Sequence, residues 1–147
     1  MNTMEKKYEL AGFGRDIFCA LRELNVGIPG ETTQGSTTTI LLDELCYAME
    51  QAMNETPKDA LPIQFKFLKE TRVQRIELSI RLEHILTGAV RAGIITQNPF
   101  DERISHRFCI SQDVATRILD TDCNYAQQVR AYAKKVQHYM EQPIIAA

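Results

Sequence analysis

The sequence contains no run of 18 or more apolar residues, and its N-terminus lacks the apolar segment of a signal peptide. Its four cysteines are scattered and form no C-x-x-C pair, which argues against a disulfide framework or a zinc site. We therefore expect a cytoplasmic protein without a membrane-spanning helix, whose cysteines are buried reduced thiols: Cys19, Cys46, Cys109 and Cys123. The 147 residues, 44% of them hydrophobic, suffice for one domain with its own core.

The chain also has little net charge, −2 at neutral pH, which argues against a protein that coats nucleic acid. The charges are unevenly distributed, because residues 1–63 carry five Lys/Arg against ten Asp/Glu, whereas residues 64–107 carry eight against five. The basic residues of this middle section are Lys66, Lys69, Arg72, Arg75, Arg81, Arg91, Arg103 and Arg107. A solvated surface is the ordinary explanation of such a bias, and a nucleic-acid contact is the alternative.

The stretch "GETTQGST", residues 30–37, has the glycine spacing and closing Thr of a phosphate-binding P-loop but lacks its lysine, since Ser36 stands in that place. The residues before it recur at helical spacing, whereas a P-loop follows a buried strand. We therefore expect a mobile Gly/Thr-rich loop from Gly27 to Thr38 that does not bind ATP. The hydroxyls of residues 36–39 are then available to cap the helix that follows.

Other groups with catalytic or metal-binding chemistry are sparse. His106 and Cys109 are three residues apart on a predicted strand and so point to opposite faces, which makes a shared metal improbable. Cys46 lies in an apolar helix, where a cysteine is usually a small core residue. We expect no catalytic residue, no metal and no cofactor, and hence a protein that is not an enzyme.

Helical periodicity predicts a first helix from about Met4 to Leu24, ended by Gly27 and Pro29, and a second over residues 40–53. Strict alternation predicts a short strand over residues 63–67. Thr71 with Gln74 forms a capping box, so a further helix is expected to begin there. Its apolar stripe changes phase, which indicates a break near Ser79 and a second helix that continues to Gly93.

The segment after this helical pair predicts a β-hairpin. Ile94 and Ile95 give a short strand, a turn is built on Asn98-Pro99, and residues 104–111 alternate in polarity. A short helix capped by Ser111 and a last helix over about residues 121–141 follow.

The order helix, strand, short helix, turn, helix and hairpin over residues 38–111 resembles a winged-helix domain. The likeness is most apparent in "LEHILTGAVRAGIITQNPFDERISHRFCIS", which is similar to the recognition helix, wing and following helix of winged helix-turn-helix regulators. The expected fold is mainly α with a small antiparallel β-hairpin or sheet. A winged-helix-like core at 38–119 then lies within a single domain, between an N-terminal helix and flexible loop at 1–37 and a C-terminal helix at 120–147.

The resemblance implies that the second central helix enters a major groove with the face opposite Leu82, Ile85 and Ala89. Arginine, histidine and threonine on that face suit contacts with base edges, and arginines elsewhere suit phosphates. The implied base-edge contacts are Arg81, His84, Thr87 and Arg91, and the implied phosphate contacts are Arg72, Arg75, Arg103 and Arg107. The expected wing tip carries Asp101 and Glu102, which would repel phosphates.

The last helix carries one apolar stripe at spacings of four, three, four and three, which is typical of a seam between helices. We interpret it as a homodimer interface, with packing against the first helix of the same chain as the alternative. The stripe consists of Tyr125, Val129, Tyr132, Val136 and Tyr139.

Two functions follow from this interpretation. The first is a small cytoplasmic winged-helix protein that binds duplex DNA as a transcriptional regulator. The second uses the same fold for contacts with another protein, as an adaptor or assembly subunit, and is favoured by the acidic N-terminal section, the acidic wing and the overall negative charge.

Overall fold

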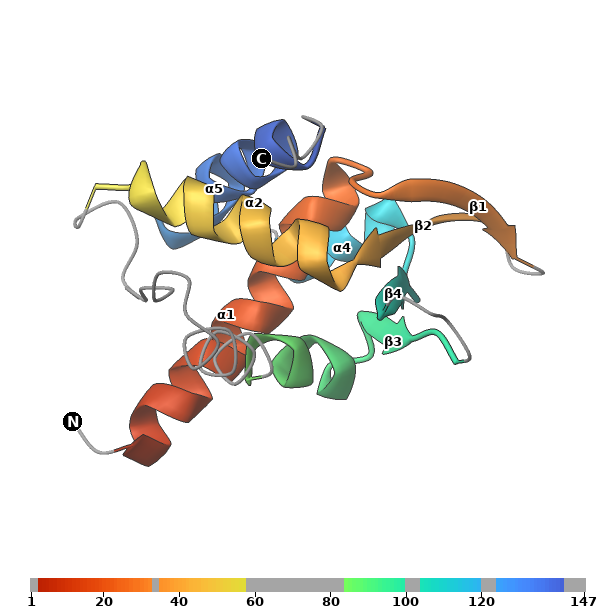
Figure 1. Cartoon of the computed structure of the whole chain (residues 1–147). Helices are drawn as coiled ribbons and strands as arrows, with labels where there is room; N and C mark the ends of the chain where they lie inside the picture. Colours follow the sequence, from red (N-terminus) through yellow and green to blue (C-terminus); the bar gives the residue numbers. More distant parts are fainter. Residues whose placement is uncertain (1–2, 33–34, 58–83, 100–103, 120–123, 142–147) are drawn as a thin grey trace.

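The computed structural model of the chain describes residues 3–32, 35–57, 84–99, 104–119 and 124–141 (Figure 1). Residues 84–91 are helical and are called the 84–91 helix below. The other elements, in chain order, are α1 (Thr3–Glu23), β1 (Ile28–Thr32), β2 (Gly35–Leu41), α2 (Leu42–Asn54), β3 (Ile95–Gln97), β4 (Ser105–Phe108), α4 (Gln112–Leu119) and α5 (Asn124–Glu141). The chain is mainly helical with a small antiparallel sheet, so this part of the predicted fold class is confirmed.

The four strands form one antiparallel sheet in the order β1-β2-β4-β3. The predicted hairpin is confirmed as β3 and β4, in which Ile95 lies opposite Phe108. One face of the sheet belongs to the core, because Ile40, Ile95 and Phe108 are buried on it. Phe108 meets Phe18 of α1 there, with ring centroids 6.2 Å apart.

The segment predicted as a mobile loop, Gly27 to Thr38, is instead largely a β-hairpin, so that prediction is wrong. Gly27 and Gly35 adopt φ angles of +118° and +120°, which side chains disfavour, and this allows the chain to turn. Residue 37, the expected boundary between the N-terminal loop and the winged-helix-like core of the single domain, lies within β2. The predicted hydroxyl cap is also wrong, because the N-cap of α2 is Leu41 and no side chain caps this helix.

The core is built around α1, which contacts both α4 and α5, while α5 also lies along α2 (Figure 1). Phe13 of α1 meets Tyr132 of α5 with ring centroids 5.9 Å apart. On α2, the side chains of Leu45, Ala48, Met49 and Ala52 are buried, whereas Leu41, just before the helix, is only half-buried.

Two helices end in the same hydrogen-bonded turn. At the end of α1, Val26 N donates to Leu21 O and Asn25 N to Arg22 O, while Asn25 has a φ of 58°. After the 84–91 helix, Ile94 N donates to Ala89 O, Gly93 N donates to Val90 O, and Gly93 has a φ of +77°. Both are Schellman motifs, in which one left-handed residue stops the helix and reverses the chain.

The apolar stripe of α5 packs inside its own chain. Val129, Tyr132 and Val136 are buried, and Tyr132 OH donates a hydrogen bond of 2.8 Å to Met49 O of α2. At the ends of the stripe, Tyr125 OH donates to Asp16 and Tyr139 OH donates to Glu55. The predicted dimer seam through the three buried residues is therefore wrong, and packing within the same chain accounts for the stripe.

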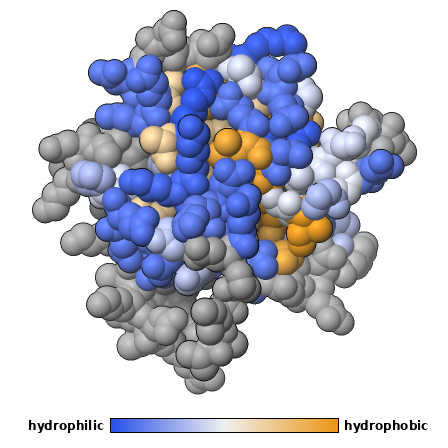
Figure 2. Space-filling model, turned by 90° about the horizontal axis from the view of Figure 1, so that it is seen from above, coloured by the Kyte–Doolittle hydropathy of each residue, from blue (hydrophilic) through white to orange (hydrophobic). Residues whose placement is uncertain are grey.

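The outer side of α5 is polar. Its exposed positions recur at helical spacing and are Asn124, Gln127, Ala131, Lys134, His138 and Glu141. Figure 2 looks down on α2 and α5 and shows mostly hydrophilic surface, with hydrophobic side chains gathered in small areas. A contact made by this side of the molecule would thus be mainly polar.

Several predictions lie outside the described residues. These are the strand at 63–67, the capping box at residues 71–74, the break near Ser79 and the acidic turn at residues 101–102. Within the helices that the structure describes, none has the length and apolar character needed to cross a bilayer.

Candidate functional site

The 84–91 helix presents one side to the core and another to solvent. Ile85 and Ala89 are fully buried, as expected, and an added Cβ on Gly14 of α1 would lie only 1.9 Å from Ile85 O, so the two backbones are in close contact. His84 and Thr87 are half-buried and Arg91 is exposed. At spacings of three and four residues, these three lie on one side of the helix.

The second described part of the predicted site is Arg107 in the middle of β4. It lies opposite Thr39 of β2 and opposite Thr96 of β3, so the three side chains share one face of the sheet. His106 and Phe108, on the other face, are buried, whereas Arg107 is exposed. Four of the predicted contacts lie outside the described residues: Arg72, Arg75, Arg81 and Arg103.

The described arginines differ in whether a carboxylate pairs with them. Arg15 pairs with Asp16 at 2.9 Å, and Arg130 pairs with Glu23 at 3.0 Å. Arg91 and Arg107, by contrast, have no carboxylate partner among the described residues. An exposed guanidinium without an internal partner keeps its donors available for phosphate or base edges.

Arg22 is the arginine whose role the sequence did not reveal. It is 6% exposed and donates to Ile110 O, Asn25 Oδ1 and Ser36 O, at 2.8, 2.7 and 3.2 Å. Its guanidinium also lies 5.9 Å from the centre of the Phe108 ring. Burial lowers the pKa of Arg22. The residue thus joins the end of α1 to the β2 hairpin and to the segment after β4, which is a structural role.

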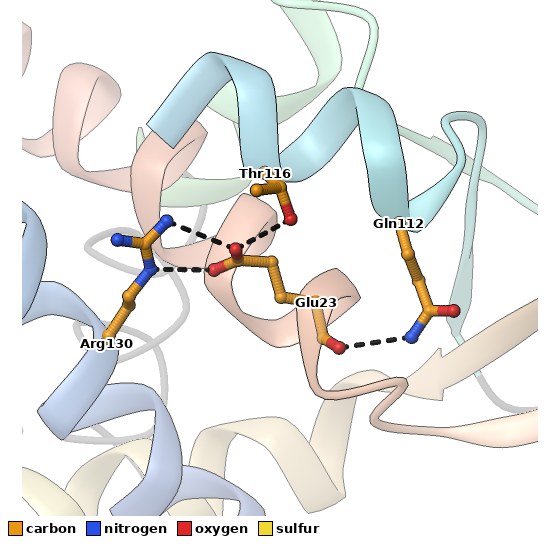
Figure 3. Close-up of polar contacts among 4 residues, drawn as sticks. All are labelled: Glu23, Gln112, Thr116 and Arg130. Carbon is orange, nitrogen blue, oxygen red and sulfur yellow. Dashed lines mark hydrogen bonds and ion pairs between the residues drawn. The ribbon is translucent and has the colours of Figure 1, made fainter. Parts of the chain in front are cut away.

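Glu23, the last residue of α1, connects three helices (Figure 3). Its carboxylate accepts hydrogen bonds from Arg130 Nε and Nη2 of α5, at 3.0 and 3.1 Å, and from the Thr116 hydroxyl of α4 at 2.8 Å. Its backbone carbonyl accepts a bond of 3.1 Å from Gln112 Nε2. The three oxygens of Glu23 in this cluster all accept hydrogen bonds from the protein itself, so we assign it a structural function.

Burial shifts the pKa of several titratable groups among the described residues. Burial raises the pKa of Cys19 to about 12 and that of Cys46 to about 11, so both thiols are unreactive near neutral pH. Cys109 is exposed, contrary to the expectation that it is buried. Burial lowers the pKa of His106. No group of three His, Cys, Asp or Glu side chains within the described ranges could hold a metal ion.

Comparison of the chain with protein-family models, with curated proteins and with solved structures gives no match.

Proposed function

We propose that this chain is a small cytoplasmic winged-helix protein that binds duplex DNA as a transcriptional regulator. The observation that carries the proposal is the order of the described elements: α1, the β1–β2 hairpin, α2, the 84–91 helix and the β3–β4 hairpin. If β2 takes the place of the strand expected at residues 63–67, this order resembles the helix, strand, helix, helix and hairpin of a winged-helix domain, with β1 as an addition. Pairing of β2 with β4 joins that strand to the hairpin.

The position and orientation of the 84–91 helix support a role in the recognition of DNA bases. Its Ile85 side is fixed against α1, and the Schellman turn at Gly93 leads directly into β3. His84, Thr87 and Arg91 therefore lie on a helix whose position is set by packing and by a rigid turn. Such preorganisation is what a side chain needs in order to read a base edge.

The second candidate function is a protein adaptor with the same fold. The observation in its favour is an exposed apolar pair on α4, Val114 and Ile118, which are 36% and 40% exposed and lie one helical turn apart. The acidic N-terminal section also favours a protein partner over a phosphate backbone.

Binding of labelled duplex DNA of random sequence, measured by fluorescence anisotropy between 50 and 200 mM salt, tests the proposal. We expect affinity to fall steeply with salt, because phosphate contacts release counterions. In a duplex selected for tight binding, Arg91→Gln should weaken binding by about 1–3 kcal/mol and leave thermal unfolding unchanged. Arg117→Gln, which removes an exposed arginine from α4, is the matched control.

Absence of DNA binding at 50 mM salt would refute the proposal. Equal effects of Arg91→Gln and Arg117→Gln would leave a nonspecific DNA binder and exclude the 84–91 helix as the recognition element.

A further inference from the structure

The face of the sheet opposite Ile40, Ile95 and Phe108 carries a row of side chains that crosses all four strands. Ile28 lies opposite Thr39, Thr39 lies opposite Arg107, and Arg107 lies opposite Thr96. Directly opposed residues on one face have Cβ atoms about 4.5–5.5 Å apart, so the three polar members form a continuous strip. We call Thr39, Arg107 and Thr96 the sheet row.

The hydroxyls of the sheet row differ from those of the neighbouring threonines. Thr37 Oγ1 donates to Phe108 O at 2.9 Å, and Thr38 Oγ1 donates to Val26 O at 2.7 Å, so both serve the fold. Thr39 and Thr96 are half-buried, and neither hydroxyl forms a hydrogen bond within the part of the chain that the structure describes. Each therefore has a donor to offer beside the guanidinium of Arg107.

The chemistry of the row suits a phosphodiester group. A guanidinium offers charged donors in a planar fork, and a hydroxyl on each side adds a neutral donor to the remaining phosphate oxygens. No member of the row carries a carboxylate, so nothing in it repels an anion.

The row also lies within a short distance of the 84–91 helix. Thr96 follows Arg91 by five residues, so their Cα atoms are at most about 17 Å apart. One strand of a duplex that contacts Arg91 can therefore continue along the sheet.

We infer that the sheet row is a contact for the phosphate backbone of duplex DNA, with Thr39 and Thr96 as positioning donors on either side of Arg107. This inference rests on the proposed function and extends it from the 84–91 helix to this face of the sheet. It assigns a DNA contact to β2, a strand that forms one half of the β1–β2 hairpin.

Salt-dependent anisotropy with duplex DNA tests the inference in the full chain. Arg107→Gln should weaken binding at 100 mM salt by about tenfold and reduce the slope of log affinity against log salt by about 0.9, because one phosphate contact is lost. Arg107→Lys keeps the charge and should keep the slope. The Thr39→Val, Thr96→Val double variant should weaken binding by about tenfold with the slope unchanged, because neutral donors release no counterion.

Arg117→Gln again serves as the control for loss of an exposed arginine, and thermal unfolding shows whether each variant is folded. If Arg107→Gln and the threonine variant bind DNA with the same affinity as Arg117→Gln, the inference is overturned while the proposed function stands. The sheet row would then be a polar surface for contact with another protein. If the wild-type chain binds no DNA, both fall. An unchanged slope in Arg107→Gln together with a lower melting temperature would also overturn the inference, because it would show a structural role.

Discussion

Arginine side chains serve different purposes in this chain, depending on their burial and on the groups around them. Arg22 is enclosed by neutral acceptors and an aromatic ring, and Arg130 is held by the Glu23 carboxylate. Arg91 and Arg107 are exposed on the two elements that a winged-helix interpretation places against DNA. The sequence alone does not show which arginines stabilise the fold and which can contact DNA, because that depends on the residues that surround each of them in the structure.

His106 makes the stability of the protein depend on pH. It is 6% exposed on the core face of β4, and burial lowers its pKa, so the folded state favours the neutral ring. An unfolded histidine titrates near pH 6.5, so the unfolded state binds more protons as the pH falls through that value, and stability falls with it.

We expect the melting temperature to fall more between pH 7.5 and 5.5 in the wild type than in His106→Gln. The control is His138→Gln, which removes an exposed histidine from α5 and should retain the wild-type fall. Identical pH profiles for all three proteins would show that the imidazolium is tolerated at position 106.

At the level of elements, two glycines of α1 should respond oppositely to alanine. A Cβ on Gly14 would lie 1.9 Å from Ile85 O, so Gly14→Ala must push the 84–91 helix away and should cost about 1–3 kcal/mol of unfolding free energy. A Cβ on Gly12 would meet no heavy atom within 4 Å, and Gly12→Ala should stabilise the helix by about 0.5–1 kcal/mol. Chemical denaturation measures both, and a stabilising Gly14→Ala would contradict the close approach.

The elements that the sequence predicted well are those whose signal is local. α1 ends close to the predicted Leu24, although the left-handed residue there is Asn25 and not the predicted Gly27. Ser111 Oγ accepts a hydrogen bond from Val114 N, which confirms the predicted cap of α4. The β1–β2 hairpin was missed because its threonines and glycines show no apolar alternation. Its strand character becomes apparent only when β4 is present as a partner for β2.

The candidate site was predictable only where it depends on local sequence. Helical phase alone places His84, Thr87 and Arg91 on one side of a helix, whereas no sequence pattern could place Thr39 beside Arg107, because the two are 68 positions apart. The apolar stripe of α5 was predictable, but the element that covers it was not. The spacing of apolar residues is the same whether the covering helix belongs to the same chain or to a partner.

At the scale of the whole molecule, the burial of Val129 and Val136 predicts the outcome of charging them. Each glutamate would be an unpaired carboxylate among α1, α2 and α5, at a cost of about 3–5 kcal/mol. The Val129→Glu, Val136→Glu variant should therefore lose cooperative thermal unfolding, because the sum reaches the total stability of a typical domain.

The matched control is Gln127→Glu, Ala131→Glu, on the exposed side of the same helix, which should unfold cooperatively. If the Val129→Glu, Val136→Glu variant were folded and its mass by light scattering were half that of the wild type, the prediction of a dimer interface through this stripe would be supported after all.

The Glu23 cluster has a consequence for how the chain is made. Its partners Gln112, Thr116 and Arg130 follow it by 89, 93 and 107 positions, and Tyr125 follows Asp16 by 109. Contacts of such sequence separation form late and slow folding, since most of the chain must be in place before they close. At about 5–20 residues per second, α1 spends roughly 5–20 s outside the ribosome before α5 exists to cover it. During that interval the side of α1 that carries Phe13 and Ile17 has no cover from α5, and such transiently exposed apolar surface favours aggregation.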